Sequence, residues 1–117
     1  MTQWRASWKR MENEKLLQAL GLCAKARALV FGTPMVCEAL RQKNKPYLVI
    51  EAADNSPNTA KRIADKCTFY EVEHWQIAAG GDALARAVGK QARVAAVAVT
   101  DENLCKLLHK VKTEQHN

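Results

Sequence analysis

Apolar residues recur along the chain with two different spacings, and the spacing changes from one segment to the next. Leu16, Leu20 and Cys23 lie three or four positions apart, which places them on one face of a predicted helix at residues 13–26. Elsewhere the apolar residues are adjacent, which is typical of short buried strands. Runs of this second kind predict four strands, at residues 29–31, 47–50, 74–77 and 94–99.

Capping residues mark where the other helices begin. Thr33 stands directly before Pro34, which predicts a helix with Thr33 as its N-cap and proline in its first turn. Ser56 and Pro57 repeat this pattern before another helix. Turn and capping residues also predict two further helices, at residues 83–88 and from residue 100 onward.

Helices and strands alternate along the chain, which predicts an α/β sheet covered by helices on both faces. Residues 13–112 are expected to form a single domain, because 117 residues suit one hydrophobic core. Residues 1–12 are a basic extension containing Trp4 and Trp8, which either lengthens the first helix, docks on the domain or acts as a separate basic arm. Residues 113–117 are a polar tail.

The charge of the chain favours a polyanionic partner. Eighteen lysines and arginines oppose 12 aspartates and glutamates, which gives a net charge of +6. No apolar stretch approaches the ~20 residues that a membrane span needs, and the N-terminus lacks the apolar core of a secretory signal. We therefore expect a cytoplasmic protein that does not enter a membrane.

The residues that usually carry catalysis or metal binding form no motif in this sequence. None of the four cysteines lies in a Cys-x-x-Cys pair, and each falls on or near the apolar stripe of a predicted helix. Buried, reduced thiols are the favoured interpretation, against a metal site or a redox pair. The histidines have no nucleophile or carboxylate partnered with them by motif. We expect no enzymatic activity, no cofactor, no metal and no small-molecule substrate.

Four short motifs, in this order and spacing, resemble one known family. They are Ser56-x-Asn58-Thr59, Asp65-Lys66-Cys67 with Tyr70, Leu84-x-Arg86-Ala87-Val88-Gly89-Lys90, and Val97-Ala98-Val99-Thr100-Asp101. Over residues 16–108 the chain resembles the ribosomal protein L-seven-Ae / L-thirty-e superfamily, whose best-known members bind kink-turn RNA, and is most similar to its bacterial YlxQ-like branch. The resemblance implies a three-layer α/β/α sandwich with a mixed sheet of about four strands. It also implies a non-enzymatic protein that binds kink-turn-like, ribosomal or other structured RNA at one edge.

In the RNA-binding relatives, the start of the second helix and the loop before the last strand contact the RNA. The relatives carry a Gly-x-Asn-Glu-x-x-Lys pattern at that helix, of which this chain keeps only Gly32. Pro34, Met35 and Glu38 replace the asparagine, glutamate and lysine. Proline and methionine offer no hydrogen bonds to base edges, so the backbone N–H groups at the helix start become the expected contact there.

The candidate RNA-binding residues therefore form two groups, one around the helix start and one in the loop. In the loop, Gly89 permits a positive φ, Lys90 and Arg93 offer charges for phosphates, and Val88 and Ala92 offer apolar contact to an extruded base. The first group is Lys25, Arg27, Gly32, Thr33, Pro34, Met35 and Arg41. The second group is Val88, Gly89, Lys90, Gln91, Ala92 and Arg93.

Each of these residues also has a purely structural interpretation. Gly32 would serve only a turn, Met35 would half-pack on the domain, and the basic residues would only solubilise the surface. An alternative function is a protein-interaction module on the same fold, with Met35 and the tryptophan-containing extension as apolar contacts. A small-molecule enzyme of the α/β type is a more distant alternative, because it needs a pocket with converging polar groups.

Overall fold

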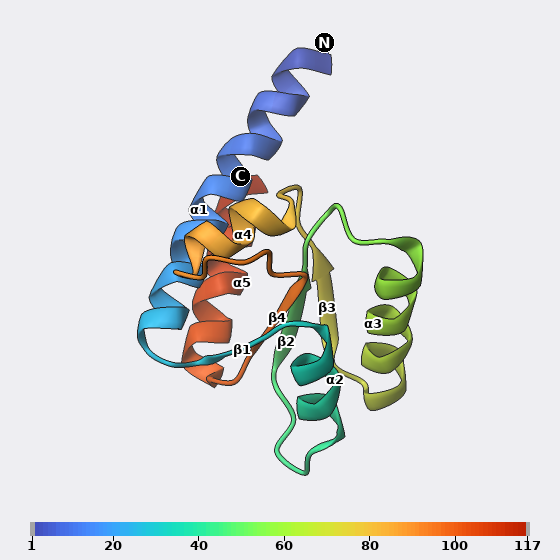
Figure 1. The fold of residues 1–117 in the computed structure, drawn as a ribbon. Helices are drawn as coiled ribbons and strands as arrows, with labels where there is room; N and C mark the ends of the chain where they lie inside the picture. Colours follow the sequence, from blue (N-terminus) through green and yellow to red (C-terminus); the bar gives the residue numbers. More distant parts are fainter. Residues whose placement is uncertain (1, 117) are drawn as a thin grey trace.

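The computed structural model describes the backbone of residues 2–116 and the side chains of residues 14–112. Over residues 2–116, five helices and four strands alternate (Figure 1). The helices are α1 (Thr2–Lys25), α2 (Thr33–Arg41), α3 (Pro57–Tyr70), α4 (Gly81–Ala87) and α5 (Glu102–His116). The strands are β1 (Leu29–Phe31), β2 (Leu48–Glu51), β3 (Glu73–Gln76) and β4 (Ala96–Val99).

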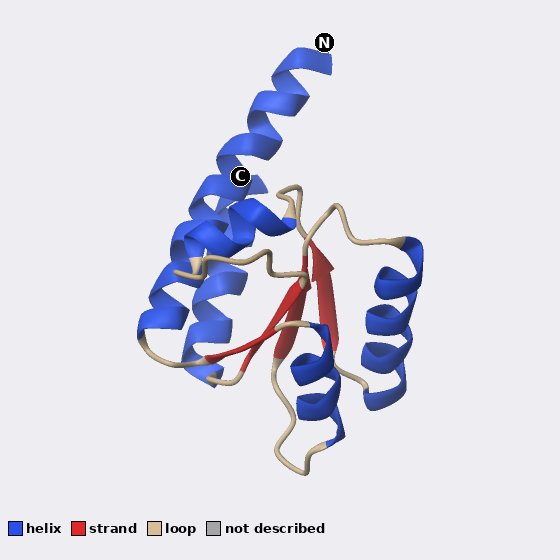
Figure 2. Ribbon diagram, viewed as in Figure 1, coloured by secondary structure: helices blue, strands red, loops and turns tan. Residues whose placement is uncertain are grey.

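The four strands form one mixed sheet in the order β1-β4-β2-β3. Strand β4 is antiparallel to both of its neighbours, whereas β2 and β3 are parallel. Helices cover both faces, with α1, α4 and α5 on one side and α2 and α3 on the other (Figure 2). This arrangement confirms the predicted α/β sandwich and its mixed four-stranded sheet.

Alternating residues of the central strands fill two separate cores. Leu48 and Ile50 of β2 and Val97 of β4 pack with α1, α4 and α5. Val49 and Ala98, their neighbours along the strands, pack with Val36, Leu40 and Ile63 of α2 and α3. Because side chains of a strand point alternately to its two faces, a strand buried on both faces reads as a continuous apolar run.

Several predicted boundaries differ from the structure by a few residues. Tyr47 is exposed and precedes β2, and the backbone adopts strand pairing only from Ala96 in the segment predicted at residues 94–99. Trp75 of β3 is only 8% exposed and belongs to the core beneath α1, α4 and α5. The extension lengthens the first helix, since α1 begins at Thr2; the side chains of Trp4 and Trp8 lie outside the described residues.

Candidate nucleic-acid interface

A glycine, and not the predicted threonine, occupies the N-cap of α2. Gly32 has φ 87° and ψ 150°, a backbone conformation that is essentially restricted to glycine. Its N–H donates to the Ala96 carbonyl at 2.9 Å, and Val36 donates the first helical hydrogen bond back to the Gly32 carbonyl. Thr33 is instead the first helical residue, and no side chain caps the helix. The predicted cap was wrong by one residue, because glycine can make this turn without a polar side chain.

The first turn of α2 presents backbone donors and apolar side chains to solvent. The amides of Thr33 and Met35 precede the first intrahelical hydrogen bond, and Pro34 has no N–H. Pro34 is exposed, and Met35 is 59% exposed, which contradicts the prediction that Met35 half-packs on the domain. The helix start therefore offers a partly positive backbone flanked by two uncovered apolar side chains.

The loop between α4 and β4, residues 88–95, begins with a tightly defined helix end. The Lys90 N–H donates to the Ala85 carbonyl at 2.8 Å, and the Gly89 N–H donates to the Arg86 carbonyl at 3.4 Å. This pair of bonds is a Schellman motif, and Gly89 supplies the positive φ of 77° that the motif requires. Val88 is only 6% exposed and belongs to the core, so its predicted contact with an extruded base was wrong.

Lys90 connects this loop to the strand that leads into α2. Its Nζ lies 4.4 Å from the centroid of the Phe31 ring, at a distance typical of a cation–π interaction. Phe31 immediately precedes Gly32, so the basic end of the loop lies over the approach to α2. The structure thus brings the helix start and the loop onto one surface. We call this surface, formed by Gly32, Thr33, Pro34, Met35, Lys90, Gln91 and Ala92, the α2–loop face.

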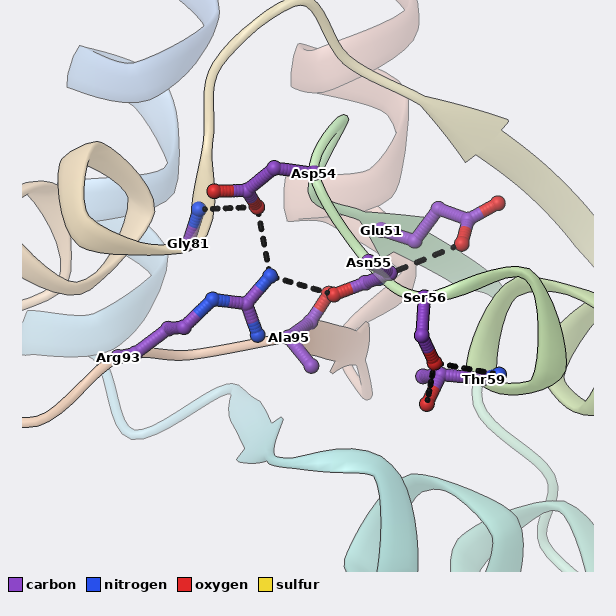
Figure 3. A network of polar contacts seen from close by, with 8 residues as sticks. All are labelled: Glu51, Asp54, Asn55, Ser56, Thr59, Gly81, Arg93 and Ala95. Atoms are coloured by element: carbon purple, nitrogen blue, oxygen red, sulfur yellow. Dashed lines mark hydrogen bonds and ion pairs between the residues drawn. The ribbon is translucent and has the colours of Figure 1, made fainter.

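Arg93 lies on the same loop but is held by other residues of the protein (Figure 3). Its Nη2 donates to Asp54 Oδ1 at 2.6 Å and to Asn55 Oδ1 at 2.9 Å. Asn55 in turn donates through Nδ2 to the Ala95 carbonyl at 2.9 Å. These bonds fasten the α4–β4 loop to the loop between β2 and α3, at residues 52–56. Arg93 was predicted to pair with phosphate, whereas in the structure its guanidinium fastens two loops together.

The carboxylate of Asp54 is the centre of this fastening. It accepts the Gly81 N–H at 2.9 Å as well as the Arg93 bond, and both interactions hold the pKa of Asp54 below its ordinary value. The backbone N–H of Gly81 is the larger cause, followed by Arg93. The carboxylate thus links Gly81, at the start of α4, to Arg93 in the loop that follows α4. We refer to Asp54, Asn55, Gly81 and Arg93 together as the latch.

Gly80 and Gly81, at the start of α4, both make room for the latch. A Cβ on Gly81 would lie 2.5 Å from Arg93 Cγ, and a Cβ on Gly80 would lie 2.7 Å from Asp54 Oδ2. The pair of adjacent glycines could have indicated these contacts from sequence, since two glycines at a helix start allow other residues to approach the backbone closely as well as allowing a turn. Their partners, about 12 and 26 residues away along the chain, carried no such signal.

The remaining basic candidates lie outside the α2–loop face. Arg27 has φ 58° at the end of α1, where β1 begins, whereas Gly32 lies at the other end of that strand. Arg41 ends α2, about 12 Å along the axis from its start, and pairs with Glu38 at 3.6 Å. Lys25 lines a groove between α1 and α4. The structure therefore does not bring these three cations together with the helix start.

The cysteines have the buried positions expected of small apolar residues. Cys23, Cys37, Cys67 and Cys105 are all free and buried within helices, which confirms the favoured interpretation. Burial raises the pKa of Cys23 and of Cys67 to about 11 and also raises that of Cys105, so these three thiols stay protonated and unreactive at neutral pH. Among the described residues, no three His, Cys, Asp or Glu side chains gather to hold a metal ion. None of the helices in that part of the chain is long and apolar enough to cross a bilayer.

Residues 14–109 match the sequence model of the ribosomal protein L7Ae/L30e/S12e/Gadd45 family. The chain belongs to this family. An RNA-binding protein YlxQ of Bacillus subtilis (strain 168) is 39% identical over 89 residues, which cover 76% of this chain and 86% of that protein. A protein of the same name from Enterococcus faecium is 28% identical over 81 residues, covering 69% and 77%. These relatives confirm the resemblance to the YlxQ-like branch.

Solved structures share the same architecture. One, described as a protein with unknown function from Bacillus halodurans C, has a TM-score of 0.75 and 32% identity, covering 85% of this chain and 97% of the other. A Giardia lamblia 15.5kD RNA binding protein has a TM-score of 0.73, covering 92% of this chain and 88% of the other. Because its sequence identity is only 20%, the Giardia protein supports the assignment of the fold alone.

Proposed function

We propose that this protein is a non-enzymatic RNA-binding protein that contacts structured RNA, kink-turn-like or ribosomal, through the α2–loop face. The contact between Lys90 and the Phe31 ring carries this proposal, because it places the basic loop beside the start of α2. The net charge of +6 and the family relatives named as RNA-binding proteins support it. We expect the protein to act in the cytoplasm, where its free cysteines stay reduced.

The proposed recognition depends on the RNA backbone and shape more than on base identity. The free amides of Thr33 and Met35 at the positive end of α2 suit a phosphate, and Lys90 adds a full charge nearby. Pro34, Met35 and Ala92 offer apolar surface to an unstacked base. None of these three side chains can read the edge of a base, so binding across related RNA sequences should vary little.

In this proposal Arg93 positions the loop and does not itself bind phosphate. Its Nη2 already donates to Asp54 and Asn55, so the latch holds the backbone of the loop beside β1. A loop fixed in advance loses less conformational entropy when RNA binds. Lys90, Gln91 and Ala92, which are exposed, then form the part of the loop that faces the RNA.

A titration of the purified protein with two fluorescent RNAs tests this function. The first RNA contains a kink-turn, and the second is a matched duplex without the G·A pairs; both are measured at two salt concentrations. Tight binding that favours the kink-turn supports recognition of that RNA shape. Equal and salt-sensitive binding supports a general backbone binder. If neither RNA binds, the proposal is wrong and the protein-interaction alternative takes its place.

A further inference from the structure

A groove of about 590 Å³ lies between α1 and α4, beside the α2–loop face but outside it. On α1 it is lined by residues at positions 17, 18, 21, 22, 24 and 25, which form a single stripe along the helix. The end of α4 and the start of the following loop, residues 86–89, form its other wall. From residue 17 to residue 25 the axis of α1 rises by about 12 Å, which equals roughly two turns of a helix lying alongside it.

The floor of this groove is apolar and consists of two partly buried residues and one buried residue. Leu17, Ala24 and Val88 line it, and Leu22 is 54% exposed at its side. At Gly21, a Cβ would lie 2.9 Å from the Ala87 carbonyl oxygen, so the two helices approach as closely as their backbones permit. An amphipathic helix binds another protein by laying its apolar face into a groove of this kind, and Leu22 would extend the apolar surface on one side.

The charged side chains among the described residues that line the groove have one sign. Lys25 and Arg86 are exposed at its rim, and no carboxylate is among the described residues that line it. A partner that covers this groove should therefore carry acidic residues beside its apolar ones. A second copy of this chain suits it poorly through its N-terminal extension, because residues 1–12 carry Arg5, Lys9 and Arg10 against a single glutamate.

We propose that the groove between α1 and α4 binds an amphipathic helix of a partner protein that has an aliphatic stripe two turns long and acidic flanks. A protein helix fits better than an RNA base, because no aromatic ring is among the described residues that line the groove. Leucine and alanine surfaces instead match aliphatic side chains spaced three and four residues apart. The groove ends at Gly89, so the bound helix would lie next to the α2–loop face without covering Met35.

Three synthetic 15-residue peptides test this proposal on the full-length ¹⁵N-labelled protein. The first has a leucine stripe at helical spacing with glutamates elsewhere, the second replaces those glutamates with lysines, and the third scrambles the order of the first. We expect the acidic striped peptide to shift the amide resonances of residues 17–25 and 86–89. The lysine and scrambled peptides should bind at least about tenfold more weakly, which corresponds to about 1.4 kcal/mol.

Two matched variants separate this site from the α2–loop face. Leu22→Glu places a charge on an exposed leucine and should weaken peptide binding at least about tenfold, while leaving RNA binding unchanged. Met35→Glu makes the same change at a similarly exposed residue of the α2–loop face, and should weaken RNA binding while peptide binding is unchanged. Circular dichroism of both variants checks that each is folded.

Three results would overturn the proposal, and the first two do not depend on whether the protein binds RNA. The first is the absence of shifts at residues 17–25 and 86–89 with the acidic striped peptide. The second is equal binding of the acidic and lysine peptides, which would remove the role of Lys25 and Arg86. The third is a loss of RNA binding in Leu22→Glu, which would assign the groove to RNA. Failure of RNA binding in the wild-type protein contradicts the proposed function alone.

Discussion

The two halves of the α2–loop face are held in place by different means. The start of α2 is fixed by backbone: Gly32 adopts its unusual φ and ψ and donates to the Ala96 carbonyl, while Pro34 and Met35 stay uncovered. The α4–β4 loop adds side-chain contacts to its backbone turn at Gly89, through Arg93, Asp54 and the buried Val88. Where backbone hydrogen bonds alone hold a surface in place, its side chains can differ without moving it. Where side-chain contacts hold the surface, replacing those side chains releases it. Side chains can therefore differ at the start of α2 without moving its backbone, whereas a change at Arg93 or Asp54 would release the loop.

The largest effect is expected at Gly32, where backbone conformation alone fixes the helix start. A Cβ at this position meets nothing within 4 Å, so Gly32→Ala tests conformational strain without a clash. We expect it to lower the free energy of unfolding by roughly 1–3 kcal/mol. Urea denaturation followed by circular dichroism measures this change.

Gly89→Ala is the matched control, since that glycine also has positive φ and open space around it. Its φ of 77° lies near the left-handed helical region that other residues can enter at a cost of about 1 kcal/mol. The smaller loss should therefore come from Gly89→Ala. Equal losses at the two glycines would contradict the claim that the start of α2 depends more on backbone geometry than the loop does.

The second prediction concerns the side-chain fastening of the loop. Arg93→Ala removes both bonds from Nη2, so we expect faster amide hydrogen exchange across residues 89–95 than in the wild type. RNA affinity should fall because the loop must then be ordered on binding. The slope of log K against log salt should not change, since Arg93 releases no counterion in our proposal. A slope reduced by about one unit would instead show that Arg93 binds phosphate.

The latch also makes stability depend on pH. Because its partners lower the pKa of Asp54 in the folded state, the latch contributes stability above the ordinary aspartate pKa, about 3.9. That contribution is lost as the pH falls through the folded-state pKa. The difference in unfolding midpoint between wild type and Asp54→Ala should therefore be constant at neutral pH and shrink in acid. A difference that persists unchanged in acid would contradict an ionised latch.

Lys90 provides the next prediction, with a smaller effect that is specific to RNA. Lys90→Ala removes one charge from the α2–loop face, so the slope of log K against log salt should fall by roughly 0.7–0.9 units. Lys110→Ala on α5, which covers the opposite face of the sheet, removes the same charge from an exposed position. The control should leave the slope and the affinity for the kink-turn RNA near their wild-type values. Equal effects of the two variants would contradict the assignment of RNA binding to the α2–loop face.

How far the sequence predicted this molecule depended on whether each feature is local. The order of the elements and the cap at Ser56 follow from residues close in sequence; its hydroxyl accepts the Thr59 N–H at 3.2 Å, as predicted. Arg93 and Asp54 are 39 residues apart, so nothing near Arg93 indicated that its charge was already paired. Val88 resembled a loop residue because it ends a helix, but the Schellman turn directs it into the core.

The same distinction separates cations that are brought together from cations that are only near in sequence. Lys25 and Arg27 lie within seven residues of Gly32, yet β1 carries the chain away from them before α2 begins. Arg41 shares a helix with Met35 but lies at its other end and pairs with Glu38. Proximity in sequence therefore predicted a basic surface larger than the α2–loop face. It did not predict the groove between α1 and α4 that Lys25 lines.

The smallest effect is expected at Arg27, and its sign is opposite to the others. Arg27 occupies the left-handed position of a Schellman turn at the end of α1, where its N–H donates to Ala24 and that of Ala28 donates to Cys23. Arg27→Gly should raise the free energy of unfolding by up to about 1 kcal/mol, because glycine enters this conformation without strain. RNA affinity should stay the same, since Arg27 lies at the far end of β1 from the α2–loop face. If the affinity and the salt slope fell as they should for Lys90→Ala, the RNA interface would extend along the whole of β1. The end of α1 would then be a third part of the interface, beside the start of α2 and the α4–β4 loop.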